Sequence, residues 1–418
     1  MNSAIAATIG LALAIVLIIR KLSPVYALLI GALVGGICAG WGLQGTVAKM
    51  IDGVKDITPA IVRIIAAGVL TGMLVKTGAA QRISLSIIKG LGAKNVYLAL
   101  ALSALILTAT GVFIDVAVIT IAPIAIITGN KLGLSRGKLL LAMIGGGKCG
   151  NIMSPNPNTI IAAENYGASL SSVMAAGILP AMIGLALTVF VIVPLMPEGE
   201  KIRLQQGAGE EEKDLPGFWE SIAGPLVAIA LLALRPICGF AVDPLVALPV
   251  GGFVGILTTR AWKRTGECLK YGLEKMSGIA VLLVGTGTIA GIIKASAIKD
   301  VLVGLLSGWD SGAVLMAPLS GTLMCAASAS TTAGATIASA SFAQTILGAG
   351  VSAVWAAAMT NAGATVLDHL PHGSFFHATG GSVGMDVKDR LKLIPYESLV
   401  GLALTACSVG AYFIFGTV

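Results

Sequence analysis

The residue with the clearest chemical signal is Asp115, an acidic side chain inside a long apolar stretch. More than a dozen uncharged residues flank it on each side. A carboxylate at the depth of a lipid bilayer costs about 2.5 to 3.5 kcal/mol on insertion scales, so its presence there requires a partner or a role. Protonation removes this cost, which makes Asp115 a candidate proton carrier. The alternative is a salt bridge to Lys148 or Lys76 that only fixes packing.

Lys148 is a second charge within an apolar segment, and it directly follows the glycine run Gly145–Gly147. Glycines let another backbone or a ligand approach closely. The ammonium group of Lys148 could therefore hold the carboxylate of a solute. An alternative of nearly equal weight makes Lys148 the counter-ion of Asp115, and the two roles could alternate.

Small polar side chains interrupt the apolar segments at two places, near Pro155 and after Ala327. Backbone amides freed at helix starts attract anions, and carbonyls and hydroxyls at helix ends can hold sodium, so these clusters are candidates for binding a solute. Each side chain alone could instead bond within its own helix. The candidates are Asn151, Ser154, Asn156, Asn158 and Thr159 in the first half, and Ser328, Ser330, Thr331, Thr332 and Asn361 in the second.

All the histidines, His369, His372 and His377, lie in one short stretch. Histidine titrates near neutrality, so His369 or His372 could relay a proton or contact the solute. A zinc site is a weaker alternative because no HExxH motif or second cluster supports it. For His377 the alternative is a capping role. The six cysteines form no zinc or disulfide spacing, and we expect no metal site.

The composition is that of a membrane protein. Of the 418 residues, 56% are hydrophobic and 11% are charged, whereas soluble domains are about half apolar and a quarter charged. Apolar stretches of about 20 residues recur, enough to cross a hydrocarbon layer of about 30 Å as helices. The net charge of +7 does not indicate nucleic acid, because the basic residues lie in short loops between apolar segments. Such residues mark the cytoplasmic side.

The basic loops divide the chain into two halves when Arg20-Lys21 is placed in the cytoplasm. The third span is predicted to begin near Pro59. The segments Ala66–Ile83 and Val284–Val301 share a Gly-rich centre, a lysine and a small-residue tail. The predicted segments are a first span (1–21), a first repeat (22–197), a polar cytoplasmic linker (198–216), a connecting span (217–237) and a second repeat (238–418).

Each predicted repeat contains one block with a polar interior and one broken helix. The blocks cover 97–129, with a break at Thr110-Gly111, and 313–347; each is either two tight spans or a re-entrant hairpin. The broken helices cover 139–163, interrupted at Gly145–Gly147 and at 154–159, and 351–371, ending at Pro371. The count of crossings gives the two halves opposite orientations.

The predicted fold class is therefore an all-α polytopic membrane protein with two inverted repeats, re-entrant hairpins and discontinuous transmembrane helices. This is the architecture of secondary transporters, which bind solute and coupling ion between the repeats. Ordinary kinks at Gly and Pro are the alternative. Matched breaks in both halves favour transport.

These motifs resemble the gluconate permease family of proton symporters, within the ion-transporter superfamily. The resemblance rests on the segments Thr110–Val116, Ser154–Pro157 and His369–Phe376, followed by Gly384–Lys388, and it extends over most of the chain. The chain departs from the family pattern at Lys148, Gly150, Asn156 and His372. The resemblance implies sugar acids, small hydroxy acids and some amino acids as solutes. It also implies a homodimer in the cell's inner (plasma) membrane, with a transport domain moving past a scaffold like an elevator.

We therefore expect proton-coupled uptake of a small hydroxy-carboxylate. Its partners would be a small anionic solute, the lipid bilayer and a second copy of the chain, with no nucleic acid and no cofactor other than the coupling ion. A sodium-coupled carboxylate carrier or a cation/proton antiporter could use the same scaffold. An intramembrane enzyme is the alternative of a different class, but the sequence offers no nucleophile or metal constellation for one.

Overall fold

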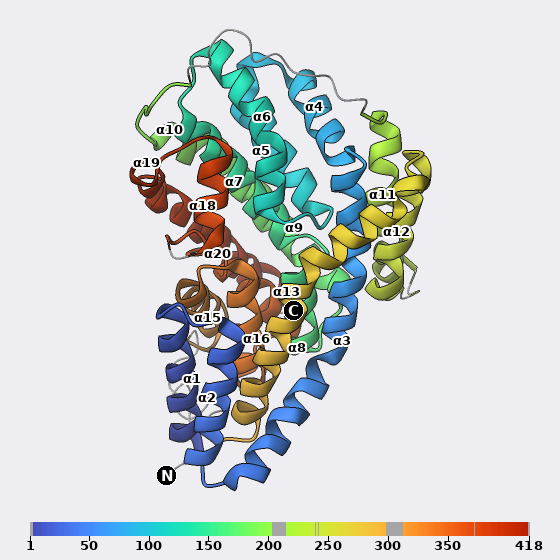
Figure 1. Cartoon of the computed structure of the whole chain (residues 1–418). Coiled ribbons are helices and arrows are strands. Elements are labelled where there is room, and N and C mark those ends of the chain that lie inside the picture. The colour runs from blue at the N-terminus through green and yellow to red at the C-terminus, as the bar shows by residue number, and fades with distance from the viewer. Residues whose placement is uncertain are drawn as a thin grey trace.

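The computed structural model describes residues 3–202, 215–238, 240, 242–297, 312–371 and 373–416. Their regular secondary structure is almost entirely helical (Figure 1). Over these residues no strand forms, and the β pairing present is an isolated bridge between Ser135 and Lys201. The predicted all-α class is confirmed. Within these described ranges, five helical segments are long and apolar enough to cross a membrane, judged by length and composition.

The described helices are divided between the two halves of the chain. The first half comprises α1 (Ser3–Ile19), α2 (Pro24–Cys38), α3 (Gly42–Lys76), α4 (Ala79–Leu91), η1 (Ala93–Asn95), α5 (Val96–Ala109), α6 (Ile114–Leu132), α7 (Arg136–Ile152), α8 (Pro157–Tyr166), α9 (Leu170–Leu187), η2 (Thr188–Ile192) and α10 (Val193–Leu195). The second comprises α11 (Phe218–Cys238), α12 (Pro244–Thr258), η3 (Trp262–Arg264), α13 (Thr265–Lys294), α15 (Gly312–Ser328), α16 (Thr331–Gly348), α17 (Ala353–Gly363), α18 (Ser374–Ser382), α19 (Val387–Leu391) and α20 (Ile394–Phe415).

The two longest helices, α3 and α13, pack along each other through glycines (Figure 1). A Cβ at Gly53 would overlap the backbone of Gly287, and one at Gly72 would overlap the carbonyl oxygen of Cys268. Later residues of α3 thus meet earlier residues of α13, so the helices run antiparallel. Pro59, where a span was predicted to begin, lies inside α3, because the helix begins at Gly42 and continues through the proline.

Helical hairpins occupy the predicted polar blocks. In the first, α5 turns through residues 110–113 into α6, and in the second, α15 turns through Ala329 and Ser330 into α16. Helix α5 has 14 residues, and at 1.5 Å per residue it is about 21 Å long, short of the roughly 30 Å hydrocarbon layer. Helix α6 is one of the five segments long enough to cross, so the shortness of α5 alone argues against two full spans in the first block.

Two pairs of short helices form the interrupted segments. The first pair is α7 and α8, separated at 153–156, and the second is α17 and α18, separated at 364–373. The predicted break at Gly145–Gly147 is wrong, since α7 runs through it. A side chain at Gly146 would overlap the carbonyl oxygen of Ala101, so glycine allows α7 to pack closely on α5. The second segment does not end at Pro371, because α18 follows it.

Matching contacts fix each hairpin to its broken helix. Thr108 of α5 donates to the carbonyl oxygen of Gly147 in α7 (2.9 Å), and Thr322 of α15 donates to that of Gly363 in α17 (3.1 Å). These bonds tie a threonine near the end of the hairpin's first arm to the first half of the broken helix. Hairpin and broken helix therefore form one packed unit in each half.

Candidate functional site

A cavity of about 310 Å³ lies where the interrupted segments of the two halves meet. The breaks bring side chains distant in sequence together here. Its wall is formed by Phe113, Ile114, Asp115, Asn151, Asn158, Lys275, Ile279, Ala329, Ser330, Thr331, Thr332, Asp368, Ser374 and Phe375. Ala329 has a φ of +47°, a left-handed conformation that is uncommon for residues other than glycine and typical of strained functional turns.

Several helices begin at this wall. Ile114, Thr331 and Ser374 are the first residues of α6, α16 and α18, and Asn158 is the second residue of α8. The first turn of a helix has unpaired N–H groups and the positive end of the helix dipole, so it attracts anions. Lys275 of α13 is the basic side chain among the described lining residues. The helix starts and Lys275 favour an anionic group, and Asp115 and Asp368 add two carboxylates to the same wall.

The structure places many of the predicted binding residues on this cavity and others behind it. Asp115, Asn151, Asn158, Ser330, Thr331 and Thr332 line it. Behind the wall lie Lys148, Ser154, Asn156, Thr159, Ser328, Asn361 and His369, all in the described part of the chain. His372 lies outside the described residues.

The residues behind the first break hold its shape. Asn156 caps α8 by accepting from the Thr159 N–H (3.1 Å), and its amide group donates to the Asn151 carbonyl oxygen (2.8 Å). Ser154 donates to the same oxygen, and Asn361 of α17 donates to Thr159. The Nδ2 atom of Asn151 is buried and has no partner among the described residues. Asn151, which lines the cavity, therefore has an unused donor buried beside the wall.

The tip of the second hairpin is joined to both broken helices. Thr331 donates to Asp368 Oδ2 (2.7 Å), and Thr332 donates to the side-chain oxygen of Asn158 (2.6 Å). Ser328, in contrast, donates to the Met324 carbonyl oxygen within its own helix. The threonines thus connect the polar breaks, whereas Ser328 has the structural role that is common for serine in helices.

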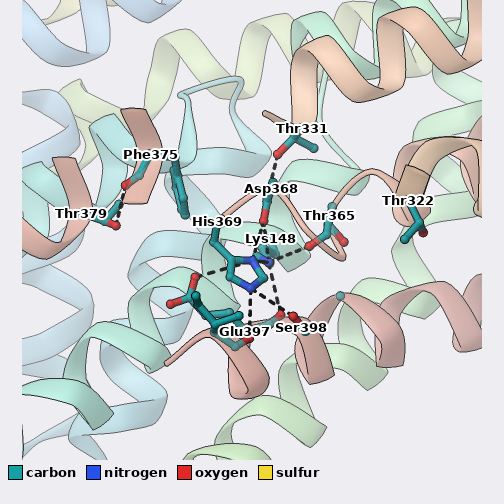
Figure 2. A network of polar contacts seen from close by, with 12 residues as sticks. Lys148, Thr322, Thr331, Thr365, Asp368, His369, Phe375, Thr379, Glu397 and Ser398 are labelled. Atoms are coloured by element: carbon teal, nitrogen blue, oxygen red, sulfur yellow. Dashed lines mark hydrogen bonds and ion pairs between the residues drawn. The ribbon is translucent and has the colours of Figure 1, made fainter. Parts of the chain in front are cut away.

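Lys148 is fully buried and forms an ion pair with Asp368, which is 2% exposed; Lys148 Nζ lies 2.7 Å from Asp368 Oδ1 (Figure 2). The same Nζ donates to the carbonyl oxygen of Thr365 (2.6 Å). The alternative that Lys148 pairs with Asp115 is wrong. Asp115 accepts from the Val116 N–H at the start of α6 and makes no ion pair with any described residue. Its position at a helix N-terminus compensates its charge instead.

His369 lies against this ion pair. Its Nδ1 is 3.0 Å from Asp368 Oδ1 and 3.1 Å from Lys148 Nζ, and its Nε2 is 3.0 Å from the Ile394 carbonyl oxygen. Ser398 Oγ lies 3.1 Å from the same Nε2 (Figure 2). The imidazole therefore links the second break to α20, away from solvent.

A second buried ion pair completes what we call the buried network: Lys148, Asp368, His369, Arg390 and Glu397. Both guanidinium ends of Arg390 contact the Glu397 carboxylate, with Nη2 3.1 Å from Oε2. The guanidinium also stacks over the Phe376 ring at 4.9 Å. Glu397 Oε2 is 3.8 Å from His369 Nδ1. Sequence reasoning missed Asp368, Arg390 and Glu397.

A separate group of charges, the Arg63 cluster, lies at another cavity of about 250 Å³. Arg63 of α3 contacts Glu164 of α8, and its Nη2 lies 2.8 Å from Oδ2 of Asp243, the residue before α12. The hydrogen bond from Arg63 lowers the pKa of the Asp243 carboxyl below its usual value of 3.8. These side chains are 25 to 43% exposed.

Comparison with known proteins gives the same family over nearly the whole chain. A model of the GntP family permeases matches residues 3–412. An uncharacterised transporter of Haemophilus influenzae is 51% identical over 413 residues, covering 99% of each chain. In Escherichia coli K12, a high-affinity gluconate transporter is 26% identical over 94% of this chain and 96% of its own, and a D-serine transporter is 24% identical over 78% of each.

A solved structure supports the fold independently. The crystal structure of the Alcanivorax borkumensis YdaH transporter, described as having an unusual topology, superposes with a TM-score of 0.67 over 90% of this chain and 89% of its own. At 15% identity the likeness concerns the fold alone. The relatives are transporters and permeases, which confirms the expectation that the protein is not an enzyme. The chain is a multi-pass membrane transporter and belongs to the GntP permease family, as the sequence motifs predicted.

Proposed function

We propose that the protein carries a small hydroxy-carboxylate into the cell together with protons. The observation that supports this most directly is the meeting of the N-termini of α6, α8, α16 and α18 at one cavity wall. The carboxylate of the solute would lie among these helix starts, where the unused amide N–H of Asn151 and the first-turn N–H groups that are not already bonded to Asp115, Asn156 or Ser330 can donate to it.

Polar side chains on the same wall suit the hydroxyl groups of such a solute. Asp115 can accept a hydroxyl hydrogen, and the amide of Asn158 has a donor for a hydroxyl oxygen. The cavity volume of about 310 Å³ is at the lower end of small-molecule sites, which run from about 300 to 1,000 Å³. Gluconate and serine, the solutes named for the two Escherichia coli relatives, each combine a carboxylate with a hydroxyl group.

For the transport cycle we propose elevator-type alternating access between two inverted repeats. The equivalent helices α3 and α13 run antiparallel, as a two-fold axis in the membrane plane requires. They would form the scaffold, and the hairpins with the broken helices would move. We further propose a homodimer in the inner membrane, which rests on the family resemblance; chemical cross-linking in membranes tests it.

Uptake of radiolabelled gluconate into proteoliposomes under an imposed pH gradient tests the proposal. We expect accumulation that requires the gradient and is unaffected when choline replaces sodium. Accumulation that follows sodium instead would identify a sodium-coupled carrier, and cation-dependent proton efflux without gluconate uptake would identify an antiporter.

Asp115 is the first residue to test in this assay. With Asp115→Asn the wall loses its hydroxyl acceptor and its candidate proton carrier, so uptake should fall. Thr345→Ser in α16, a buried residue away from the cavity, serves as the control. Undiminished uptake by Asp115→Asn would remove Asp115 from both roles.

A further inference from the structure

We infer that the coupling proton binds at Nδ1 of His369 and that the Lys148–Asp368 ion pair transmits its charge to the solute cavity. This inference rests on the proposed proton coupling. It assigns the proton to the buried network rather than to Asp115, which the sequence made the first candidate. Asp115 would then only contact the solute.

Three polar atoms form a close triangle in the buried network. Lys148 Nζ lies 2.7 Å from Asp368 Oδ1, and His369 Nδ1 lies 3.1 Å from the first and 3.0 Å from the second. An ammonium only donates hydrogen bonds and a carboxylate only accepts them, whereas an imidazole nitrogen can do either. One of the two contacts of Nδ1 is therefore mismatched in each protonation state.

The contacts of the other ring nitrogen favour a hydrogen on Nε2. Nε2 lies 3.0 Å from the Ile394 carbonyl oxygen, which only accepts, and 3.1 Å from Ser398 Oγ, which can accept as well, so an N–H at Nε2 satisfies both contacts whether or not Nδ1 is protonated. In neutral His369, Nδ1 accepts from Lys148 and opposes Asp368. When a proton from water in the cavity binds Nδ1, the N–H donates to Asp368 and the imidazolium repels Lys148. Each state thus favours a different arrangement of Lys148 and Asp368.

The charges around His369 cancel one another, so protonation of His369 sets the net charge of the buried network. Lys148 of α7 and Glu397 of α20 face the imidazole together with the adjacent Asp368, and Arg390 of α19 pairs with Glu397. Among the described residues, the buried Cys325 thiol of α15 is near enough to Asp368 to interact with its charge. The two cations and two carboxylates balance, so protonation of His369 gives the buried network one net positive charge.

Asp368 connects the protonation of His369 to the solute cavity. Its Oδ2 accepts from Thr331, the first residue of α16, and both residues line the cavity (Figure 2). An anion bound at the wall stabilises the imidazolium behind Asp368, and the imidazolium in turn stabilises the anion. Because such coupling is reciprocal, solute and proton each raise the affinity for the other.

Proton uptake on binding, measured with a pH indicator in weakly buffered detergent solution, tests the inference. We expect wild-type protein to take up a proton as gluconate binds, and its affinity for gluconate to rise about tenfold from about pH 8 to pH 6, within the usual range for coupled sites. In His369→Asn, whose side-chain oxygen can still accept from Lys148, proton uptake and this pH dependence should both disappear.

The same variants in proteoliposomes separate the possible failures. His369→Asn should lose gradient-driven accumulation of gluconate while gluconate exchange across the membrane stays measurable. Asp115→Asn should bind gluconate more weakly yet still take up a proton with it. Proton uptake retained in His369→Asn, or abolished in Asp115→Asn, would overturn the inference. A wild-type protein that ignores the pH gradient would instead overturn the proposed function.

Discussion

The buried network and the Arg63 cluster are both groups of opposite charges at a cavity, but they differ in burial and in what they connect. Lys148, Asp368 and Glu397 are at most 2% exposed, whereas the Arg63 cluster is 25 to 43% exposed. The network lies among α7, the second break, α19 and α20, while the Arg63 cluster links α3 to α8 and α12. Burial makes it costly to leave one charge of the network without its partner, whereas the exposed charges of the Arg63 cluster can separate at little cost.

Removing one charge from the buried network should have the largest effect. In Asp368→Asn the ammonium of Lys148 stays buried without a counter-ion, which should lower the free energy of unfolding by about 3 to 5 kcal/mol. Thermal unfolding in detergent measures this. The double variant Asp368→Asn with Lys148→Met removes both charges and should recover much of the loss. If Asp368→Asn lost no more stability than a variant that breaks the exposed Arg63 cluster, burial would not distinguish the two groups.

The second-largest effect on stability is expected from disturbing the close packing of α7 on α5, which holds Lys148 of the buried network in place. Gly146→Ala forces a methyl group against the Ala101 carbonyl oxygen and should cost about 1 to 3 kcal/mol of stability. Gly278→Ala in α13 is the matched control, since nothing lies within 4 Å of that position. It should leave stability unchanged or raise it by about 0.5 to 1 kcal/mol. Equal effects of the two substitutions on stability would mean that α7 is not closely packed on α5 near the buried network.

Breaking the Arg63 cluster should change transport more than stability. Glu164→Gln should shift the free energy of unfolding by less than about 1 kcal/mol, but it releases α8 from α3 and should alter the rate of gluconate uptake. Asp52→Asn is the control, because the Asp52–Lys55 pair is also exposed but lies within α3 alone. Identical uptake rates for both variants would show that the Arg63 cluster has no role in the motion.

The smallest effect is expected from the pH dependence of the Arg63 cluster. Because the pKa of Asp243 is lowered by the Arg63 hydrogen bond, its stabilising charge is present above pH 3.8 and is lost only as the pH falls through the lowered value. Melting temperatures of wild type and Asp243→Asn should therefore differ by a constant amount between about pH 5 and 8. A difference that varies in this range would place a titrating group in this cluster.

The positions of the chain breaks could be read from the sequence because proline and runs of small polar residues cannot continue an apolar helix unsupported. Ser154–Thr159 and Ser328–Thr332 marked two of these breaks, and the structure brings side chains from both to one cavity. The glycine run at Gly145–Gly147 misled the prediction. Glycine also serves close helix packing, and only the position of α5 shows which of the two applies.

The partners of the buried charges could not be predicted. The one sequence signal for Asp368 was its position directly before His369 at a chain break, where an acid and a histidine can form a pair. Arg390 lies between Lys388 and Lys392 and looked like one more basic loop residue. Its burial depends on Glu397, seven positions later, and on the stacking with Phe376, contacts that only the folded chain reveals.

The charge balance of the buried network has a consequence for the energy source of transport. Lys148 and Arg390 offset Asp368 and Glu397, so with neutral His369 this group would move through the membrane's electric field without electrical work. One proton carried with a monoanion leaves that sum at zero. Each uncompensated charge would feel about 2.3 kcal/mol per 100 mV. Uptake of a monoanion with one proton would therefore draw on the pH gradient alone, whereas a zwitterion on the same route would also be pulled inward by the membrane voltage.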